Sequence, residues 1–213
     1  NIMRVIGMTL SEKYRPKSFD DVVYQTHVVP SLKLINEKKQ MPNLLFVGPP
    51  GCGKTTCAYL LAKNRGHLSE FNASDERGID VVREKIKHLA LSTQEQIIFL
   101  DEADNLTPDA QGALRRIMEG VTNATFILSV NREHKLISAI KSRCAIFRFA
   151  QIPDDLVRER IMKVLQDEEI EPDGDVSDLK DGLNSLVKNA RGDLRYALNT
   201  LDTVVTDDKK IKA

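Results

Sequence analysis

Residues 48–56 have the composition and spacing of a loop that binds phosphate. The segment reads Gly-Pro-Pro-Gly-Cys-Gly-Lys-Thr-Thr and directly follows the apolar run Leu-Leu-Phe-Val at 44–47. Its glycines allow the backbone to approach a polyphosphate and turn successive N–H groups toward it, and a helix that begins near Lys54 adds the positive end of its dipole. We therefore expect a strand, a phosphate-binding turn and a helix rather than an ordinary glycine-rich loop.

The side chains of this loop predict a nucleotide with a divalent cation. Lys54 is placed to reach the β and γ phosphates, and the Thr55 hydroxyl is a ligand suited to Mg²⁺. The residues expected to contact the nucleotide phosphates are Gly48, Pro49, Pro50, Gly51, Cys52, Gly53, Lys54, Thr55 and Thr56.

Two carboxylates stand at the end of a second apolar run, Ile-Ile-Phe-Leu at 97–100. A lone charge at the tip of a buried strand is costly, so Asp101 and Glu102 imply a nearby cation. We expect Asp101 to hold Mg²⁺ through its hydration shell and Glu102 to orient and deprotonate an attacking water. Taken alone, the pair indicates a solvated acidic turn equally well; the phosphate loop upstream favours the catalytic interpretation.

Three more polar residues are candidates for the same site. Asn131 follows the apolar stretch 126–130, where its amide could position water or touch the γ-phosphate, although an Asn there is usually a turn residue. Arg143 could stabilise charge on a transferred phosphoryl group of a neighbouring subunit, although spacing alone favours a surface salt bridge. Arg195 could reach the nucleotide from the last helix, and by itself reads as a solvated charge.

Alternating strand and helix patterns predict an α/β fold. Strands are expected at 44–47, 69–72, 97–101, 125–130 and 145–149, and helices at 28–37, 54–64, 79–91 and 108–119. This order predicts a three-layer arrangement, a parallel sheet covered on both faces, with the nucleotide at the carboxyl ends of the strands. Helical patterns at 154–167, 176–190 and 193–205 predict a second, small domain. We thus divide the sequence into domains at 1–150 and 151–213.

Composition sets further limits. The 213 residues carry 31 basic and 31 acidic side chains, and the first 150 residues are net basic while the remainder is net acidic, which is compatible with a nucleic-acid partner. Cys52, Cys57 and Cys144 lack metal-site or disulfide spacing and are expected to be reduced thiols. Without a membrane-length apolar run or signal-peptide pattern, we expect a soluble intracellular protein without a membrane partner.

Six short segments together resemble the sequence boxes of the replication factor C small subunit, and they occur in the order of that family. They are Glu-Lys-Tyr-Arg-Pro at 12–16, the phosphate loop, Phe-Asn-Ala-Ser-Asp-Glu-Arg-Gly at 71–78, Asp-Glu-Ala-Asp at 101–104, Ser-Arg-Cys at 142–144 and Gly-Asp-Leu-Arg at 192–195. The family is the AAA+ clamp loader. The resemblance implies a P-loop ATPase domain with a helical lid and a pentameric ring of large and small subunits. With ATP and Mg²⁺, such a ring opens a sliding clamp and places it on primer-template DNA.

The resemblance also implies individual roles. Asn131 matches the first sensor, Arg143 the arginine finger that acts on a neighbouring subunit and Arg195 the second sensor, with ATP and Mg²⁺ between the two domains. Tyr14, Arg15, Pro16 and Val23 match the adenine pocket. Arg77, Arg83 and Lys87 fall where family members follow the DNA backbone; Arg83 and Lys87, four apart, share a helix face, which also fits an ordinary exposed helix.

The sequence departs from the family in two ways. The connections at 62–71 and 91–97 are shorter than expected, and a collar domain, which holds the ring together, is not expected within the sequence up to Ala213. Hydrolysis is expected to depend on assembly. Two other functions stay open: a different AAA+ DNA-remodelling ATPase, such as a helicase loader or branch-migration motor, and a non-catalytic ring scaffold that binds ATP. The location would be cytoplasmic in an archaeon and nuclear in a eukaryote.

Overall fold

The computed structural model describes residues 8–63, 65–75, 77–92, 94–172, 176–205 and 210–211. They fall into two compact units. The sheet unit comprises residues 18–48 and 53–149, and the helical unit comprises the described parts of 1–17, 49–52 and 150–213. The last change of unit along the chain comes after residue 149. The division into domains at 1–150 and 151–213 stays a prediction.

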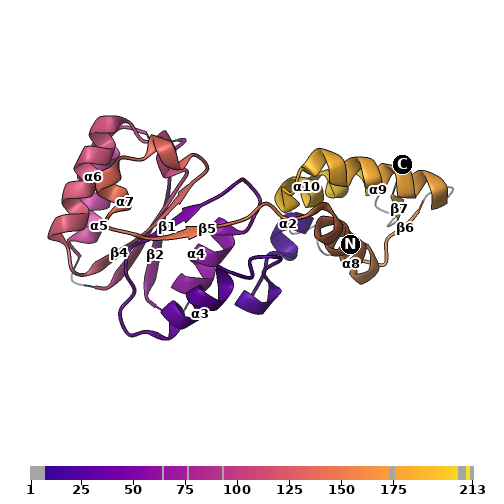
Figure 1. Cartoon of the computed structure of the whole chain (residues 1–213), viewed down its shortest axis with the longest axis horizontal. Helices are drawn as coiled ribbons and strands as arrows, with labels where there is room; N and C mark the ends of the chain where they lie inside the picture. Colours follow the sequence, from indigo (N-terminus) through magenta and orange to yellow (C-terminus); the bar gives the residue numbers. More distant parts are fainter. Residues whose placement is uncertain are drawn as a thin grey trace. The chain divides into compact units, whose positions relative to one another are not determined.

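The sheet unit is built on five parallel strands (Figure 1). They are β1 (Leu44–Val47), β2 (His67–Asn72), β3 (Gln96–Asp101), β4 (Ala124–Val130) and β5 (Ala145–Arg148), in the spatial order β2-β3-β4-β1-β5. The central strands are apolar on both faces because helices cover both, and Ile98, Phe99 and Leu100 are at most 1% exposed. The predicted fold class and all five predicted strands are thereby confirmed.

Helices from two parts of the chain cover the two faces of the sheet (Figure 1). On one side lie α3 (Val29–Glu37) and α4 (Lys54–Ala62); on the other lie α5 (Lys87–Ala90), α6 (Pro108–Gly120) and α7 (Ser138–Lys141). Thr107 caps α6 by accepting the Ala110 N–H, and Pro108 occupies the first turn. Short helical turns η1 (Phe19–Asp21), η3 (Ala103–Asn105) and η4 (Glu133–Lys135) join these elements.

The helix predicted at 79–91 differs in its winding. Residues Val81–Ile86 form a π-helix, η2, which continues into α5. Val82 and Ile86 are buried against the sheet unit core, so the apolar periodicity correctly placed a helix but carried no signal of its wider turn.

The helical unit contains α2 (Leu10–Lys13), α8 (Asp154–Asp167), α9 (Val176–Ala190) and α10 (Leu194–Val204). The three helices predicted after residue 153 are confirmed, the last with Asp193 as its N-cap. Two short strands, β6 (Glu171–Pro172) and β7 (Lys210–Ile211), pair in parallel and were not predicted. Within the described part of the chain, no helix is long and apolar enough to cross a membrane.

Candidate active site

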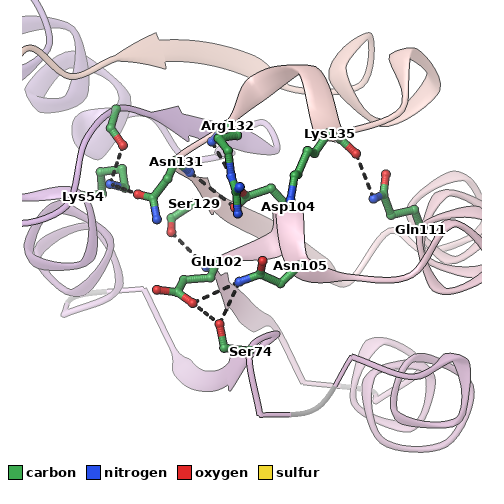
Figure 2. Close-up of polar contacts among 11 residues, drawn as sticks. Lys54, Ser74, Glu102, Asp104, Asn105, Gln111, Ser129, Asn131, Arg132 and Lys135 are labelled. Atoms are coloured by element: carbon green, nitrogen blue, oxygen red, sulfur yellow. Dashed lines mark hydrogen bonds and ion pairs between the residues drawn. The ribbon is translucent and has the colours of Figure 1, made fainter.

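The phosphate loop joins β1 to α4, as the sequence predicts. Gly51 and Gly53 have φ of 67° and 101°, a backbone region that L side chains rarely adopt, so glycine is required at both positions. Lys54 is only 7% exposed, and its Nζ donates to the Gly48 carbonyl oxygen at 2.8 Å and to Asn131 Oδ1 at 3.0 Å (Figure 2). Lys54 therefore links the loop to the tip of β4, and a γ-phosphate would compete for the same ammonium group.

Thr55 and Asp101 lie side by side at the carboxyl edge of the sheet. Thr55 Oγ1 donates to Asp101 Oδ2 at 3.0 Å, and the Ser129 hydroxyl donates to Asp101 Oδ1. One hydroxyl and one carboxylate oxygen suit Mg²⁺, which usually keeps several waters and takes its other ligands from phosphates. The described residues contain no cluster of three or more His, Cys, Asp or Glu that could hold a metal ion. The donor set thus fits the predicted ion.

Glu102 follows β3 in a left-handed conformation, with φ of 53°. Its N–H donates to Asp101 Oδ1 at 3.1 Å and to Ser129 Oγ at 3.2 Å. These two hydrogen bonds fix the backbone that presents the carboxylate, which offsets the cost of a positive φ in a non-glycine residue.

The Glu102 carboxylate accepts hydrogen bonds from two polar neighbours (Figure 2). The Ser74 hydroxyl donates to Oε2, and Asn105 Nδ2 donates to the same oxygen at 3.1 Å and to Ser74 Oγ at 2.7 Å. To accept a proton from water, this oxygen must first lose these hydrogen bonds. Ser74 and Asn105 therefore restrain the carboxylate in the structure.

Asn131 and Arg132 extend past the end of β4 toward Asp104. Asp104 is 5% exposed, and its carboxylate accepts the N–H of Asn131 at 3.3 Å and that of Arg132 at 3.2 Å (Figure 2). Arg132 Nε lies 3.6 Å from the same carboxylate. The predicted sensor Asn131 is therefore brought to Lys54, and Asp104 fixes its backbone.

Arg143 follows α7 on the surface of the sheet unit. Its guanidinium donates to the Ala139 carbonyl oxygen at 2.5 Å and forms an ion pair with Glu119 at the end of α6. Its neighbour Cys144 is largely covered, and burial raises the pKa of that thiol to about 12. Arg143 thus has partners within its own chain, and action on a neighbouring subunit stays a prediction.

The residues predicted for the adenine pocket divide between the two units. In the helical unit, the Tyr14 hydroxyl donates to Glu168 Oε1 at 2.7 Å, and Arg160 donates to the Tyr14 carbonyl oxygen at 2.9 Å. Burial, followed by this hydrogen bond to Glu168, raises the pKa of Tyr14 well above its usual range. Arg15 and Pro16 follow directly, partly buried, and Arg195 lies exposed in the first turn of α10.

Within the sheet unit, Val23 is partly buried after η1. Its neighbour Val22 lies closer to the phosphate loop, because Val22 Cγ1 is 3.7 Å from the position that a Cβ on Gly53 would occupy. Val22 therefore borders the loop, a role that the sequence did not indicate.

Two of the three residues predicted to contact DNA lie at one hollow of about 340 Å³, which Arg83 and Lys87 line together with Arg116 of α6. The third, Arg77, is exposed near Ser74, to whose carbonyl oxygen its Nε donates at 2.9 Å. The shared hollow supports the expectation that Arg83 and Lys87 face the same way despite the π-helical winding.

Comparison with known families agrees with this geometry. Residues 44–152, which include β1, the phosphate loop, β3 and β4, match the model of the ATPase family associated with various cellular activities (AAA). The chain belongs to the AAA family. The shared AAA fold also appears in the Holliday junction branch migration motor RuvB of Thermotoga maritima, with a TM-score of 0.71 and 22% identity over 90% of this chain and 65% of that one. A mutant of the same RuvB gives a TM-score of 0.74 at 21% identity over 94% and 70% of the two chains.

Curated relatives of this AAA protein include replication factor C small subunits. That of Haloarcula marismortui is 47% identical over 89% of this chain and 60% of its own length, and that of Aeropyrum pernix is 44% identical over 92% and 62%. The resemblance expected from the sequence boxes is thereby confirmed. The chain spans about 60% of the length of these relatives.

Several polar residues of this AAA site were not predicted from the sequence. Ser74, Asn105, Asp104 and Ser129 hold Glu102, Asn131 or Asp101 in place. Ser74 and Asp104 lie in two of the segments that resemble the family, at 71–78 and 101–104. Their position in these segments was the sequence signal that could have indicated a role in the site. Ser129 gave no such signal, because it lies within an apolar strand.

Proposed function

We propose that this chain binds ATP with Mg²⁺ and hydrolyses it as the ATPase module of a clamp-loader small subunit. One observation carries the proposal: Lys54, Thr55, Asp101, Glu102 and Asn131 meet at the carboxyl edge of a single parallel sheet, joined by the contacts described above. In sheets of this kind, ligands bind at that edge.

Each residue has a role in the proposed reaction. The loop backbone and Lys54 bind the β and γ phosphates, while Thr55 and Asp101 would hold Mg²⁺, which neutralises charge on the phosphates. Glu102 orients the attacking water and takes its proton after leaving Ser74 and Asn105. Asn131 contributes its amide at the γ-phosphate. Tyr14, Arg15, Pro16 and Val23 are the residues proposed to contact adenine, and Arg195 is proposed as the second sensor.

We further propose that hydrolysis is completed by assembly. Arg143, carried on the surface at the end of α7, would exchange Glu119 for the γ-phosphate of a neighbouring subunit, where a guanidinium stabilises the charge of the transferred group. The partners would be large and small clamp-loader subunits, a sliding clamp, and primer-template DNA, whose backbone Arg77, Arg83 and Lys87 would contact. Because the relatives reported above come from archaea, we propose a cytoplasmic location.

The function is tested by reconstituting the full-length protein with candidate clamp-loader subunits. The proposal predicts ATP turnover that rises when sliding clamp and primed DNA are added together, and clamp loaded onto primed circles. Stimulation by junction DNA or by a helicase instead would support a different DNA-remodelling ATPase. Undetectable turnover with retained ATP binding would support a scaffold. Both results would contradict the proposal.

A further inference from the structure

We propose that Asp104 is a positioning residue for hydrolysis: through the backbone of residues 131 and 132 it sets the place of the Asn131 amide and, through that amide, of Lys54. The inference rests on the proposed function, in which Asn131 and Lys54 contact the γ-phosphate. In this inference, Asp104 and Arg132 affect the reaction without contacting the nucleotide.

The Asp104 carboxylate is buried. The Asp104 side chain is 2% exposed, and a charge so deeply buried is retained only where hydrogen bonds and a counter-ion compensate it. The Asp104 carboxylate accepts hydrogen bonds from the N–H groups of Asn131 and Arg132 and forms an ion pair with the Arg132 guanidinium. All three groups belong to the two residues that follow β4, so these contacts of the carboxylate all hold this one segment.

Asn131 follows the point where the pairing of β4 ends. The described pairing of β4 with β3 stops at Leu128, opposite Leu100, and its pairing with β1 stops at Val130, opposite Val47. Asn131 therefore lies beyond both ladders. Without the Asp104 carboxylate, the Asn131 N–H would lose the acceptor described above, and the backbone that carries the amide would lose this hydrogen bond.

A continuous series of contacts joins Asp104 to the phosphate loop (Figure 2). Asp104 belongs to η3, which directly follows Asp101 and Glu102. It holds Asn131, whose Oδ1 accepts from Lys54 Nζ at 3.0 Å, and Lys54 in turn donates to the Gly48 carbonyl oxygen. The buried Asp104 carboxylate thus links two parts of the site: the segment that carries Asp101 and Glu102, and the phosphate loop. A shift of Asp104 would therefore move the Asn131 amide that is proposed to contact the γ-phosphate.

The test uses the full-length chain assembled with its partner subunits. Asp104→Asn should lower kcat by about 10- to 100-fold, the cost expected of a displacement near 1 Å at a reacting group, while KM and ATP affinity change less than about 2-fold. Asn131→Ala should cause a similar loss, and the double variant should be no slower than Asn131→Ala alone, because both changes remove the same positioned amide. Arg132→Gln, which leaves the two backbone hydrogen bonds, should give an intermediate loss.

Two controls separate positioning from a general loss of structure. Asp109→Asn alters an exposed carboxylate in the first turn of α6 and should leave kcat unchanged. Amide hydrogen exchange should quicken at residues 131 and 132 of Asp104→Asn and stay unchanged in the core of β4. Should Asp104→Asn unfold the chain, Arg132→Gln still tests the inference, because it removes only the ion pair with Asp104 and should give the intermediate loss of kcat.

Particular results would overturn the inference. One is an unchanged kcat in Asp104→Asn, with or without a lowered melting temperature, while kcat of Asn131→Ala falls. The other is a loss of kcat in the double variant equal to the product of the two single losses. An unchanged kcat in Asn131→Ala would instead show that the proposed role of Asn131 itself is wrong.

Discussion

Gln111 provides the clearest link between one buried side chain and the stability of the sheet unit. It is 3% exposed on α6, and its amide connects three segments. Nε2 donates to the carbonyl oxygens of Leu106 and Lys135, both at 3.1 Å, and Oε1 accepts the Ile137 N–H at 2.9 Å. Figure 2 shows its contact with Lys135. Replacing it with Leu should therefore leave two carbonyl groups and one N–H without their partner.

The size of the effect follows from these three groups. A buried polar group left without a hydrogen bond costs about 1–3 kcal/mol, and the exposure of Lys135 allows water to replace part of the loss. We expect Gln111→Leu to lower the free energy of unfolding by about 3 kcal/mol, which corresponds to roughly 6–12 °C in melting temperature for a chain of this size. Urea unfolding followed by circular dichroism, with calorimetry, measures both quantities.

Gln96 is a matched control in the same unit. It is 7% exposed at the start of β3, and its Oε1 is buried without a hydrogen-bond partner in the described structure. Because replacing an unpartnered polar group with an apolar one is close to neutral, Gln96→Leu should change the free energy of unfolding by less than about 1 kcal/mol. Equal losses in the two variants would refute the reasoning, since burial rather than hydrogen bonding would then explain both.

Three further predictions concern the site and its surroundings. Ser74→Ala removes a donor that holds Glu102 and should raise the basal ATP turnover of the unassembled chain a few-fold; a fall would contradict the held position. Arg143→Ala should leave this subunit's ATP affinity within about 2-fold while slowing a neighbouring site by about 10³-fold or more in a reconstituted ring, and a purely local loss of affinity would argue against action in trans. Burial raises the pKa of Cys144 to about 12, whereas the thiol of the unfolded chain ionises near about 8.5. The free energy of unfolding should therefore decline as pH rises from about 8.5 toward 12. Cys144→Ala should remove this part of the decline, as measured by urea unfolding at a series of pH values.

Much of the fold could be predicted because its signals are local. The apolar runs before Gly48 and Asp101, the glycines with positive φ and the Thr107-Pro108 helix start each depend on residues adjacent in sequence. The gathering of Lys54, Asp101 and Asn131 followed from one further rule, that parallel strands place their carboxyl ends at the same edge.

The contacts that hold the site were not predictable in the same way. Ser74 meets Glu102 from 28 positions away, and Gln111 bonds to residues 24 and 26 positions away; each reads locally as a turn or surface residue. The π-helical winding of Val81–Ile86 carries no sequence period that separates it from an α-helix. Partners from distant segments are specified by packing, which only the three-dimensional structure supplies.

The central claim, that Glu102 activates water for ATP hydrolysis beside Lys54 and Thr55, is tested most directly by Glu102→Gln. The amide keeps the size of the side chain but cannot take a proton. We predict that the variant, in an assembled complex, binds ATP as tightly as the unchanged protein and loses turnover by at least about 100-fold, the scale of a general base. Undiminished turnover in that complex would contradict the account.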